Sequence, residues 1–220
     1  MLSERLSEKL KSIVEDLWIE ATDKEFLVSM AKGTLDIELF KNYMIQDYLY
    51  LKDYIGILKK IHEMSEDEKL VEFLERIICD TEYETYKVHV PNLRLLGITD
   101  EDIEQCQKGQ VITDYVAYMM SQLEKYGILA GLTALLQCSW NYAYIADVVS
   151  KRYSDELVNS RYKNWFEAYT NKDYVESNQL WIDALDGKAA DISIDETDRL
   201  CNIFITCAKY ENKLWDFLAE

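Results

Sequence analysis

The sequence predicts an all-α protein, a single-domain helical bundle over residues 1–220. One proline and seven glycines leave few of the turn residues that β-hairpins and multi-stranded sheets need. Apolar residues instead recur at intervals of three and four along most of the chain, which is the period of an amphipathic helix. No linker-like, repetitive or low-complexity stretch divides the sequence. A chain of this length can bury a sizeable core as one domain.

The amphipathic pattern begins at the N-terminus. The expected helices cover residues 2–21, 26–31, 36–62, 65–88, 99–105, 111–126, 126–146, 158–169, 173–185 and 195–218. In the first of them, Leu6, Leu10 and Leu17 share one face. Gly33 is expected to cap the second helix, because glycine readily takes the left-handed conformation that ends many helices. Thr34 is then expected to mark the start of the third.

The long third helix has an acid in its apolar stripe. Asp47 lies four residues after Tyr43 and four before Leu51, so it shares their face. A carboxylate buried there needs a partner or a raised pKa. Alternatively, Asp47 lies at the edge of the stripe and caps or pairs locally, and the sequence leaves both interpretations open. Tyr50 and Tyr54 follow nearby, where tyrosines are more often core residues than ligand contacts.

Local patterns place the boundaries of the next helix. Ser65 with Glu68 three residues later matches a capping box and predicts a helix start. His89, Pro91 and Gly97 indicate the break after this helix.

Aromatic residues mark the helices that follow. Tyr115 lies on the apolar face of the helix that begins after Gly109, and Tyr169 ends the helix over residues 158–169. The helix over residues 173–185 is expected to end before Gly187.

Residues 126–146 carry no formal charge and are expected to form the central buried helix. A membrane span is the alternative for an uncharged run of this length. Gln137, Ser139 and Asn141 interrupt its apolar character near the middle, which favours a core helix. Cys138 and Tyr142 are four residues apart and therefore share a face.

The last helix carries a second acid in its apolar stripe. Glu211 lies four residues after Cys207 and four before Trp215. Cys138, Asp47 and Glu211 are therefore three ionisable groups on apolar helix faces, which suggests a polar pocket inside a bundle. A thiolate nucleophile with two acids suits attack on an electron-poor centre. The alternative for Cys138 is an inert buried thiol, which is the more common case.

The composition excludes several classes of function. The formal charge of −17, with 41 acids against 24 bases, argues against binding to nucleic acid, which requires basic side chains. Five cysteines are odd in number and lack metal-site spacing, which favours reduced thiols. The charged N-terminus has no signal-peptide core, so a cytoplasmic protein is expected. His62 and His89 do not fit a Glu-x-x-His metal motif, and neither a metal nor a cofactor is expected.

Three segments resemble the TenA family, also called thiaminase II. The first is G-T-L-x-x-x-x-F-x-x-Y-x-x-Q-D-Y-x-Y-L over residues 33–51. The second is C-S-W-N-Y over residues 138–142, and the third is Tyr210-Glu211 followed by Trp215. The resemblance keeps the order and approximate spacing of these motifs and covers nearly the whole chain.

The resemblance implies a haem-oxygenase-like helical fold without haem, usually a homotetramer, and an aminopyrimidine hydrolase of thiamin salvage. The implied substrate is 4-amino-5-aminomethyl-2-methylpyrimidine, converted to the hydroxymethyl pyrimidine with loss of ammonia, with thiamin a slower substrate. By match of motif, Cys138 is the expected nucleophile, Glu211 the acid/base, and Asp47 the partner of the ring nitrogen and the 4-amino group. The expected pocket lining is Tyr50, Tyr54, Tyr115, Tyr142 and Tyr169.

The chain also departs from the family pattern. Gln137 and Ser139 stand where the family commonly has prolines around the cysteine, and Lys24-Glu25 replaces a His-Pro pair. The helix entry near Cys138 is therefore expected to differ. Two alternatives to a thiamin-salvage hydrolase are a non-catalytic regulatory protein that binds pyrimidine or thiamin, and an oxidoreductase of the same fold.

Overall fold

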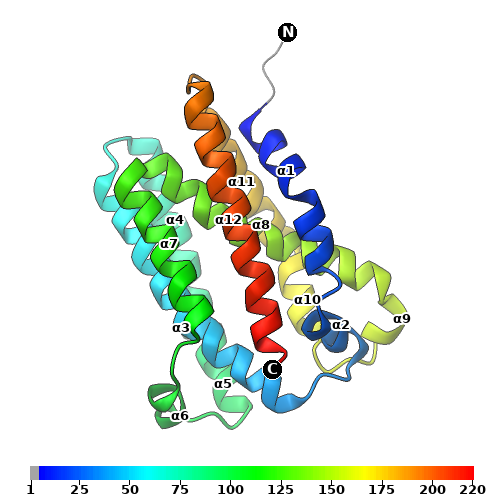
Figure 1. Cartoon of the computed structure of the whole chain (residues 1–220). Coiled ribbons are helices and arrows are strands. Elements are labelled where there is room, and N and C mark those ends of the chain that lie inside the picture. The colour runs from blue at the N-terminus through cyan, green and yellow to red at the C-terminus, as the bar shows by residue number, and fades with distance from the viewer. Residues whose placement is uncertain (1–4) are drawn as a thin grey trace. The chain divides into compact units, whose positions relative to one another are not determined.

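The computed structural model describes residues 5–220 except for the side chain of Val88, and no strand occurs among these residues. The all-α prediction is confirmed. The helices of Figure 1 are α1 (Leu6–Ala21), α2 (Glu25–Lys32), α3 (Ile37–Met64), α4 (Glu68–Tyr83), the π-helix η1 (Glu84–His89), α5 (Val90–Leu95), α6 (Asp100–Gln105), α7 (Gln110–Tyr126), α8 (Ile128–Arg152), α9 (Ser154–Leu157), α10 (Lys163–Thr170), α11 (Lys172–Lys188) and α12 (Ile194–Leu218).

The chain divides into two compact units. The terminal unit comprises residues 1–35 and 132–220, and the middle unit comprises residues 36–131. The division falls inside α8. The single domain expected from the sequence stays a prediction.

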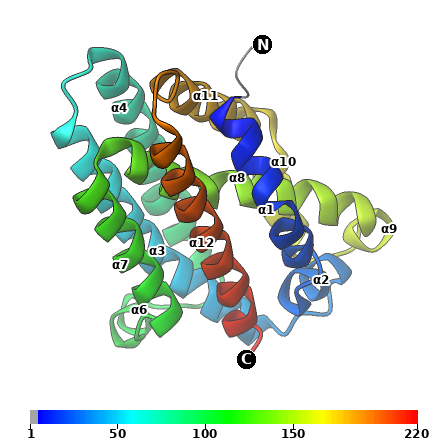
Figure 2. The ribbon, with the colours of Figure 1, turned by 45° about the horizontal axis from the view of Figure 1, so that its top comes forward.

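In the terminal unit, α1 lies alongside α12 (Figures 1 and 2) and also packs against α11. The ring of Trp18 on α1 lies 5.4 Å from that of Trp140 on α8 and 6.2 Å from that of Phe204 on α12. Aromatic side chains bury large apolar areas, so this cluster ties three helices together. The side-chain amide of Asn212 donates to the carbonyl of Leu17 at 3.1 Å and adds a polar link between α1 and α12.

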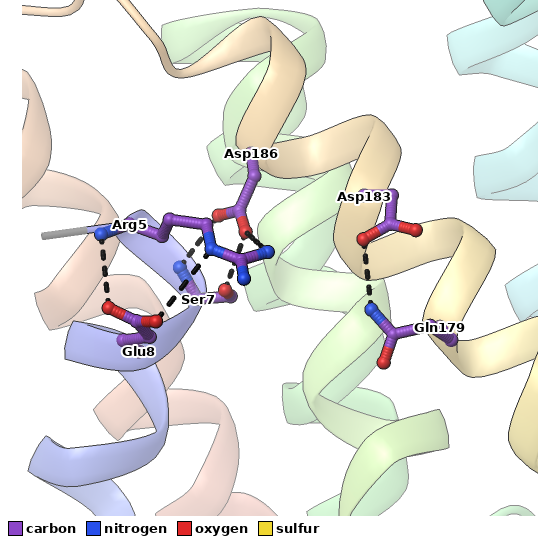
Figure 3. A network of polar contacts seen from close by, with 6 residues as sticks. All are labelled: Arg5, Ser7, Glu8, Gln179, Asp183 and Asp186. Carbon is purple, nitrogen blue, oxygen red and sulfur yellow. Dashed lines mark hydrogen bonds and ion pairs between the residues drawn. The ribbon is translucent and has the colours of Figure 1, made fainter.

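A polar network attaches the start of α1 to α11 (Figure 3). Ser7 donates from its backbone N–H at 2.8 Å and from its hydroxyl at 2.6 Å to the two carboxylate oxygens of Asp186. Arg5 forms ion pairs with Asp186 at 3.9 Å and with Glu8 at 3.7 Å. The first N–H groups of a helix lack partners within the helix. Here a carboxylate from a distant segment satisfies one of them.

Gly33 ends α2 in the left-handed conformation, with φ at 71°, as predicted. A Cβ at this position would lie 3.3 Å from the Cα of Ser160, so the neighbouring backbone is also close. The Ser160 hydroxyl donates to the carbonyl of Met30 at 2.6 Å, and the Tyr162 hydroxyl donates to that of Leu35 at 2.8 Å. The turn after α2 is therefore held by the segment before α10.

In the middle unit, α3 packs against α4, α5, α7 and η1. The buried amide of Gln46 on α3 fixes the loop before α7: its Nε2 donates to the carbonyl of Gln107 and its Oε1 accepts from the N–H of Gly109, both at 2.9 Å. Gly131 approaches the unit's core closely, because a Cβ there would lie 2.9 Å from Leu123 and 3.0 Å from Ile61.

The third helix begins where predicted, but its start signal is Asp36 and not Thr34. Asp36 caps α3, and its carboxylate accepts from the N–H of Glu38 at 2.8 Å. The predicted start of the next helix at Ser65 is wrong. Ser65 is the C-cap of α3, and α4 is capped by Asp67. A carboxylate directly before the first turn accepts from that turn's N–H groups, and it decides the boundary here.

The predicted break at His89 and Pro91 is also wrong. The helix continues from α4 through η1 into α5, and the chain turns only at Gly97, with φ at 79°. Pro91 lies in the first turn of α5. Proline has no N–H to donate and its ring crowds the preceding turn, and here it directly follows the wider turn of the π-helix.

The uncharged run over residues 126–146 is not one helix. Tyr126 ends α7, Gly127 takes a φ of 84°, and α8 begins at Ile128 and continues to Arg152. Glycine adopts this backbone conformation without a steric cost. Within residues 5–220, no helix is long and apolar enough to cross a membrane.

Two boundaries in the C-terminal part also differ from the prediction. Residues 158–162 are not helical, and α10 begins only at Lys163. In contrast, α11 continues through Gly187 to Lys188. A Cβ added at Gly187 would meet nothing within 4 Å. An exposed glycine lowers helix stability but does not by itself end a helix.

Candidate active site

Cys138 lies in the middle of α8, and its side chain is 8% exposed. Tyr142, one turn later on the same face, is also buried. Most of the α8 residues around them are buried as well, which agrees with the prediction of a central core helix. The thiol is therefore held by a regular helix inside the terminal unit.

Aromatic rings surround Tyr142. Its ring centroid lies 5.0 Å from that of Tyr169 and 5.9 Å from that of Trp165, both on α10, and 5.4 Å from that of Trp215 on α12. The Tyr142 and Tyr169 rings meet edge to face, which is a favourable arrangement for aromatic pairs. The structure thus brings the two predicted tyrosines of this unit into contact.

Glu211 on α12 is 1% exposed, which confirms that this acid faces the core. It lies one turn before Trp215, just as Cys138 lies one turn before Tyr142. The rings of Tyr142 on α8 and Trp215 on α12 are in contact. The Cys138 thiol and the Glu211 carboxyl group each lie one helical turn before one of these two rings.

Asp47 on α3 belongs to the middle unit, where its carboxylate is buried and has a partner. Its Oδ2 lies 3.0 Å from the Nε2 of His89, and both side chains are 8% exposed. Of the two interpretations that the sequence left open, the buried and paired acid is confirmed.

The three predicted tyrosines of the middle unit also lie together. The ring of Tyr50 stacks on that of Tyr115 at 5.8 Å and lies 5.8 Å from that of Tyr54. All three side chains are buried. Tyrosine rings from α3 and α7 therefore form one aromatic surface in the same unit as Asp47.

His89 and Glu84, two titratable groups near Asp47, both have a raised pKa. Burial alone lowers the pKa of His89, but its contact with Asp47 and the charges of Asp47 and Glu84 raise it above the usual value. Burial raises the pKa of Glu84 to about 7, and the nearby Asp47 carboxylate adds to this effect. The carboxylate of Asp47 therefore lies near two titratable groups, His89 and Glu84, whose pKa values are both raised.

Comparison with known proteins identifies the family. A family model described as the TENA/THI-4/PQQC family matches residues 12–220, which is nearly the whole chain. The chain belongs to the TENA/THI-4/PQQC family. It is 27% identical over 217 residues to an aminopyrimidine aminohydrolase of Helicobacter pylori, covering 96% of this chain and 97% of that protein. It is 28% identical over 209 residues to an aminopyrimidine aminohydrolase of Halalkalibacterium halodurans, covering 92% and 90%.

The fold agrees with this family. A solved structure described as a TenA homologue from P. horikoshii OT3 superposes with a TM-score of 0.86 at 28% identity, covering 98% of each chain. The helical fold expected from the resemblance to TenA is therefore confirmed.

The departures from the TenA pattern do not interrupt α8. Gln137 is buried within the helix, and Ser139 donates from its hydroxyl to the Oδ1 of Asn178 at 2.6 Å. The Tyr174 hydroxyl donates to the Ser139 carbonyl at 3.1 Å. Because Cys138 lies in the middle of α8, Gln137 and Ser139 do not alter a helix entry, and that expectation is wrong. The polar contacts of Ser139 tie this part of α8 to α11 instead.

Sequence reasoning missed His89 and Glu84. Glu84 lay within the predicted helix over residues 65–88 and His89 at the break after it, although Thr85, His89 and Leu93 continue the buried stripe of α4 at intervals of four. This spacing was the pattern in the sequence that could have placed His89 on an inward face.

A surface depression of about 390 Å³ on α3 and α7 does not include the predicted site residues. It is lined by charged side chains, among them Lys52, Lys59 and Lys60. In the part of the chain that the structure describes, no group of three or more His, Cys, Asp and Glu side chains is arranged to hold a metal ion.

Proposed function

We propose that this protein is a hydrolase that acts on aminopyrimidines of thiamin salvage. The observation that carries the proposal is Cys138, a buried thiol on a regular helix beside an aromatic cluster, in a chain of the TENA/THI-4/PQQC family. Two relatives that match it almost from end to end are aminopyrimidine aminohydrolases. The proposed substrate is 4-amino-5-aminomethyl-2-methylpyrimidine, with thiamin as a slower one.

In the proposed reaction, the sulfur of Cys138 adds to the pyrimidine ring, and the proton lost by the thiol goes to a ring nitrogen, from which it returns when the sulfur leaves. Loss of aromaticity allows the exocyclic CH2 group to expel its amine, which leaves as ammonia after accepting a proton. Water then adds to the CH2 carbon, the bond between sulfur and the ring breaks, and the aromatic ring is restored. The balance is one amine and one water consumed, and one alcohol and one ammonia formed.

Two acids have separate proposed roles. Glu211 donates the proton to the leaving amine and later takes one from the attacking water, as a general acid and base. Its burial suits this role, because a carboxyl group away from bulk water exchanges protons with its ligand rather than with solvent. Asp47 accepts hydrogen bonds from the 4-amino group and a protonated ring nitrogen.

Tyrosines supply the proposed contacts with the flat face of the ring. Tyr142 and Tyr169 are in ring contact in the terminal unit, and Tyr50 is in ring contact with Tyr54 and Tyr115 in the middle unit. Aromatic rings stack on a flat heterocycle, and tyrosine hydroxyls fix its orientation.

The experiment that tests this function is a parallel incubation of the protein with the aminomethyl pyrimidine and with thiamin. We expect equal amounts of ammonia and hydroxymethyl pyrimidine from the first, and the same pyrimidine, formed more slowly, with the free thiazole from the second. Absence of the pyrimidine alcohol from both reactions would overturn the proposed function.

We also propose that the protein assembles as a homotetramer, as the resemblance to TenA implies. Light scattering coupled to size exclusion should give a mass about four times that of the 25.9 kDa chain. A monomeric mass at working concentration would contradict this assembly.

A further inference from the structure

A buried ion pair in the middle unit involves a residue with no role in the reaction proposed above. The Nε2 of His89 and the Oδ2 of Asp47 are 3.0 Å apart, and both atoms are shielded from solvent. Within residues 5–220, this ion pair is the only polar partner of either atom. A buried carboxylate without a partner is strongly unfavourable, and His89 supplies that partner for Asp47.

The π-helix η1 places His89 next to α3. Ile77, Thr81, Thr85, His89 and Leu93 follow one another at intervals of four, and four of these five side chains are buried. In a regular α-helix, each step of four turns the side chain by about 40°, so a stripe with this spacing would leave the core. The wider turn of a π-helix, with its i to i+5 hydrogen bonds, compensates for this rotation. The six residues of η1 therefore keep His89 on the face that packs against α3.

Glu84, the first residue of η1, favours the same pairing of His89 with Asp47. Its negative form and that of Asp47 both favour the protonated form of His89. The charged groups that act on His89 are therefore Asp47 from α3 and Glu84 from η1 itself. A protonated His89 gives Asp47 a full counter-charge rather than a neutral donor.

We propose that His89 is a positioning residue for Asp47. By pairing with Oδ2, it fixes the orientation of the carboxylate and leaves Oδ1 to accept from an aminopyrimidine. No hydrogen bond from the described side chains reaches Oδ1. This inference rests on the substrate-binding role proposed for Asp47. The ligand contact belongs to Asp47, and His89 acts through it.

The test compares His89→Leu, which removes the ion pair, with His89→Gln, whose amide nitrogen takes a place close to that of Nε2. We expect His89→Leu to raise the KM for the aminomethyl pyrimidine about tenfold, with kcat changed by less than about threefold. His89→Gln should return KM to within about threefold of the wild-type value. His62→Gln is the matched control, because His62 also pairs with a carboxylate, that of Glu75 at 3.5 Å, outside this cluster. It should leave both constants unchanged.

A double-mutant comparison separates this proposal from the proposed function. In an Asp47→Asn background, His89→Leu should add no further increase in KM, because the group through which it acts is gone. If Asp47→Asn raises KM and His89→Leu does not, the positioning role is wrong while the proposed function stands. If Asp47→Asn leaves KM unchanged, the binding role of Asp47 is wrong and the positioning role falls with it. Equal losses in His89→Leu and His89→Gln would indicate a packing effect and would also overturn the proposal.

Folding is checked by circular dichroism and thermal unfolding of every variant. If His89→Leu does not fold, His89→Asn replaces it, since its amide is one methylene shorter than that of glutamine and does not reach Oδ2. A His89→Asn variant with the KM of His89→Gln would contradict the positioning role.

Discussion

Asp47 illustrates how a single side chain links sequence and function. Its position in an apolar stripe predicts burial, and the ion pair with His89 shows how the structure accommodates the charge. Replacing Asp47 with Asn keeps the shape but turns one acceptor into a donor. We expect the variant to raise the KM for the aminomethyl pyrimidine by about tenfold or more, the usual cost of losing a hydrogen bond to a charged group. Steady-state ammonia release measures this, and unchanged kinetic constants would contradict the role of Asp47.

At the scale of single residues, helical periodicity predicted which acids and thiols are buried but not which side chains they pair with. Asp47, Cys138 and Glu211 are all buried, as the intervals of three and four indicated. His89 was missed because the partner of Asp47 lies on another helix, and helical spacing relates residues only within one helix.

At the scale of the helical element, alanine substitutions at Gly33 and Gly56 are expected to change the free energy of unfolding in opposite directions. Gly33 has a φ of 71°, and an added Cβ would crowd Ser160, so Gly33→Ala should lower the free energy of unfolding by about 1–2 kcal/mol. Gly56 lies inside α3, where an added Cβ meets nothing within 4 Å, so Gly56→Ala should raise it by about 0.5–1 kcal/mol. Urea unfolding of both variants provides the test, and a destabilised Gly56→Ala would show that α3 is not helical at this position.

The π-helix predicts a pH dependence of stability. The pKa of Glu84 is raised to about 7 in the folded protein, so the native state holds a proton that the unfolded chain loses from about pH 4.5 upward. The raised pKa of His89 acts in the same direction, since its contribution is complete below its unfolded pKa and is lost as the pH rises through its folded pKa. Both groups therefore lower stability as the pH rises.

Glu84→Gln isolates the first of these contributions. Between about pH 4.5 and 7, the stability of wild type relative to this variant should fall by up to a few kcal/mol. Urea unfolding at several pH values measures this difference, with the exposed Glu66→Gln as the control for losing one carboxyl group. A difference that stays constant or rises with pH would contradict the raised pKa of Glu84.

The helix boundaries show where sequence reasoning failed at this scale. Glycine was a reliable marker at Gly33 and Gly97, where φ is positive. Gly127 also has a positive φ but was placed inside a predicted helix, and Gly187, taken as a helix end, lies inside α11. The π-helix was missed because its hydrogen bonds leave no distinctive residue type in the sequence.

At the scale of the whole molecule, the formal charge of −17 predicts that the protein does not bind nucleic acid directly. A mobility-shift assay with duplex DNA at low salt is the most sensitive test, because binding driven by phosphate contacts is strongest there. We expect no shifted band at micromolar protein. A salt-sensitive shift would support the regulatory alternative instead.

The fold class and the family motifs were accessible from the sequence because helical periodicity and spacing extend over the entire chain. The contacts of Ser139 with α11 were not, since they depend on packing between segments far apart in sequence. The capping residues Asp36 and Asp67 act locally, but neighbouring Thr34 and Ser65 offered competing start signals.

The most direct test of the central claim is ammonia release from the aminomethyl pyrimidine by Cys138→Ala, compared with wild type and with Cys201→Ala. Cys201 on α12 is a matched control, because it is 7% exposed against 8% for Cys138. We expect Cys138→Ala to fold normally and to lose turnover, since alanine is a good helix former but cannot attack the ring, while Cys201→Ala stays active. Normal ammonia release by Cys138→Ala would contradict the assignment of this thiol as the nucleophile.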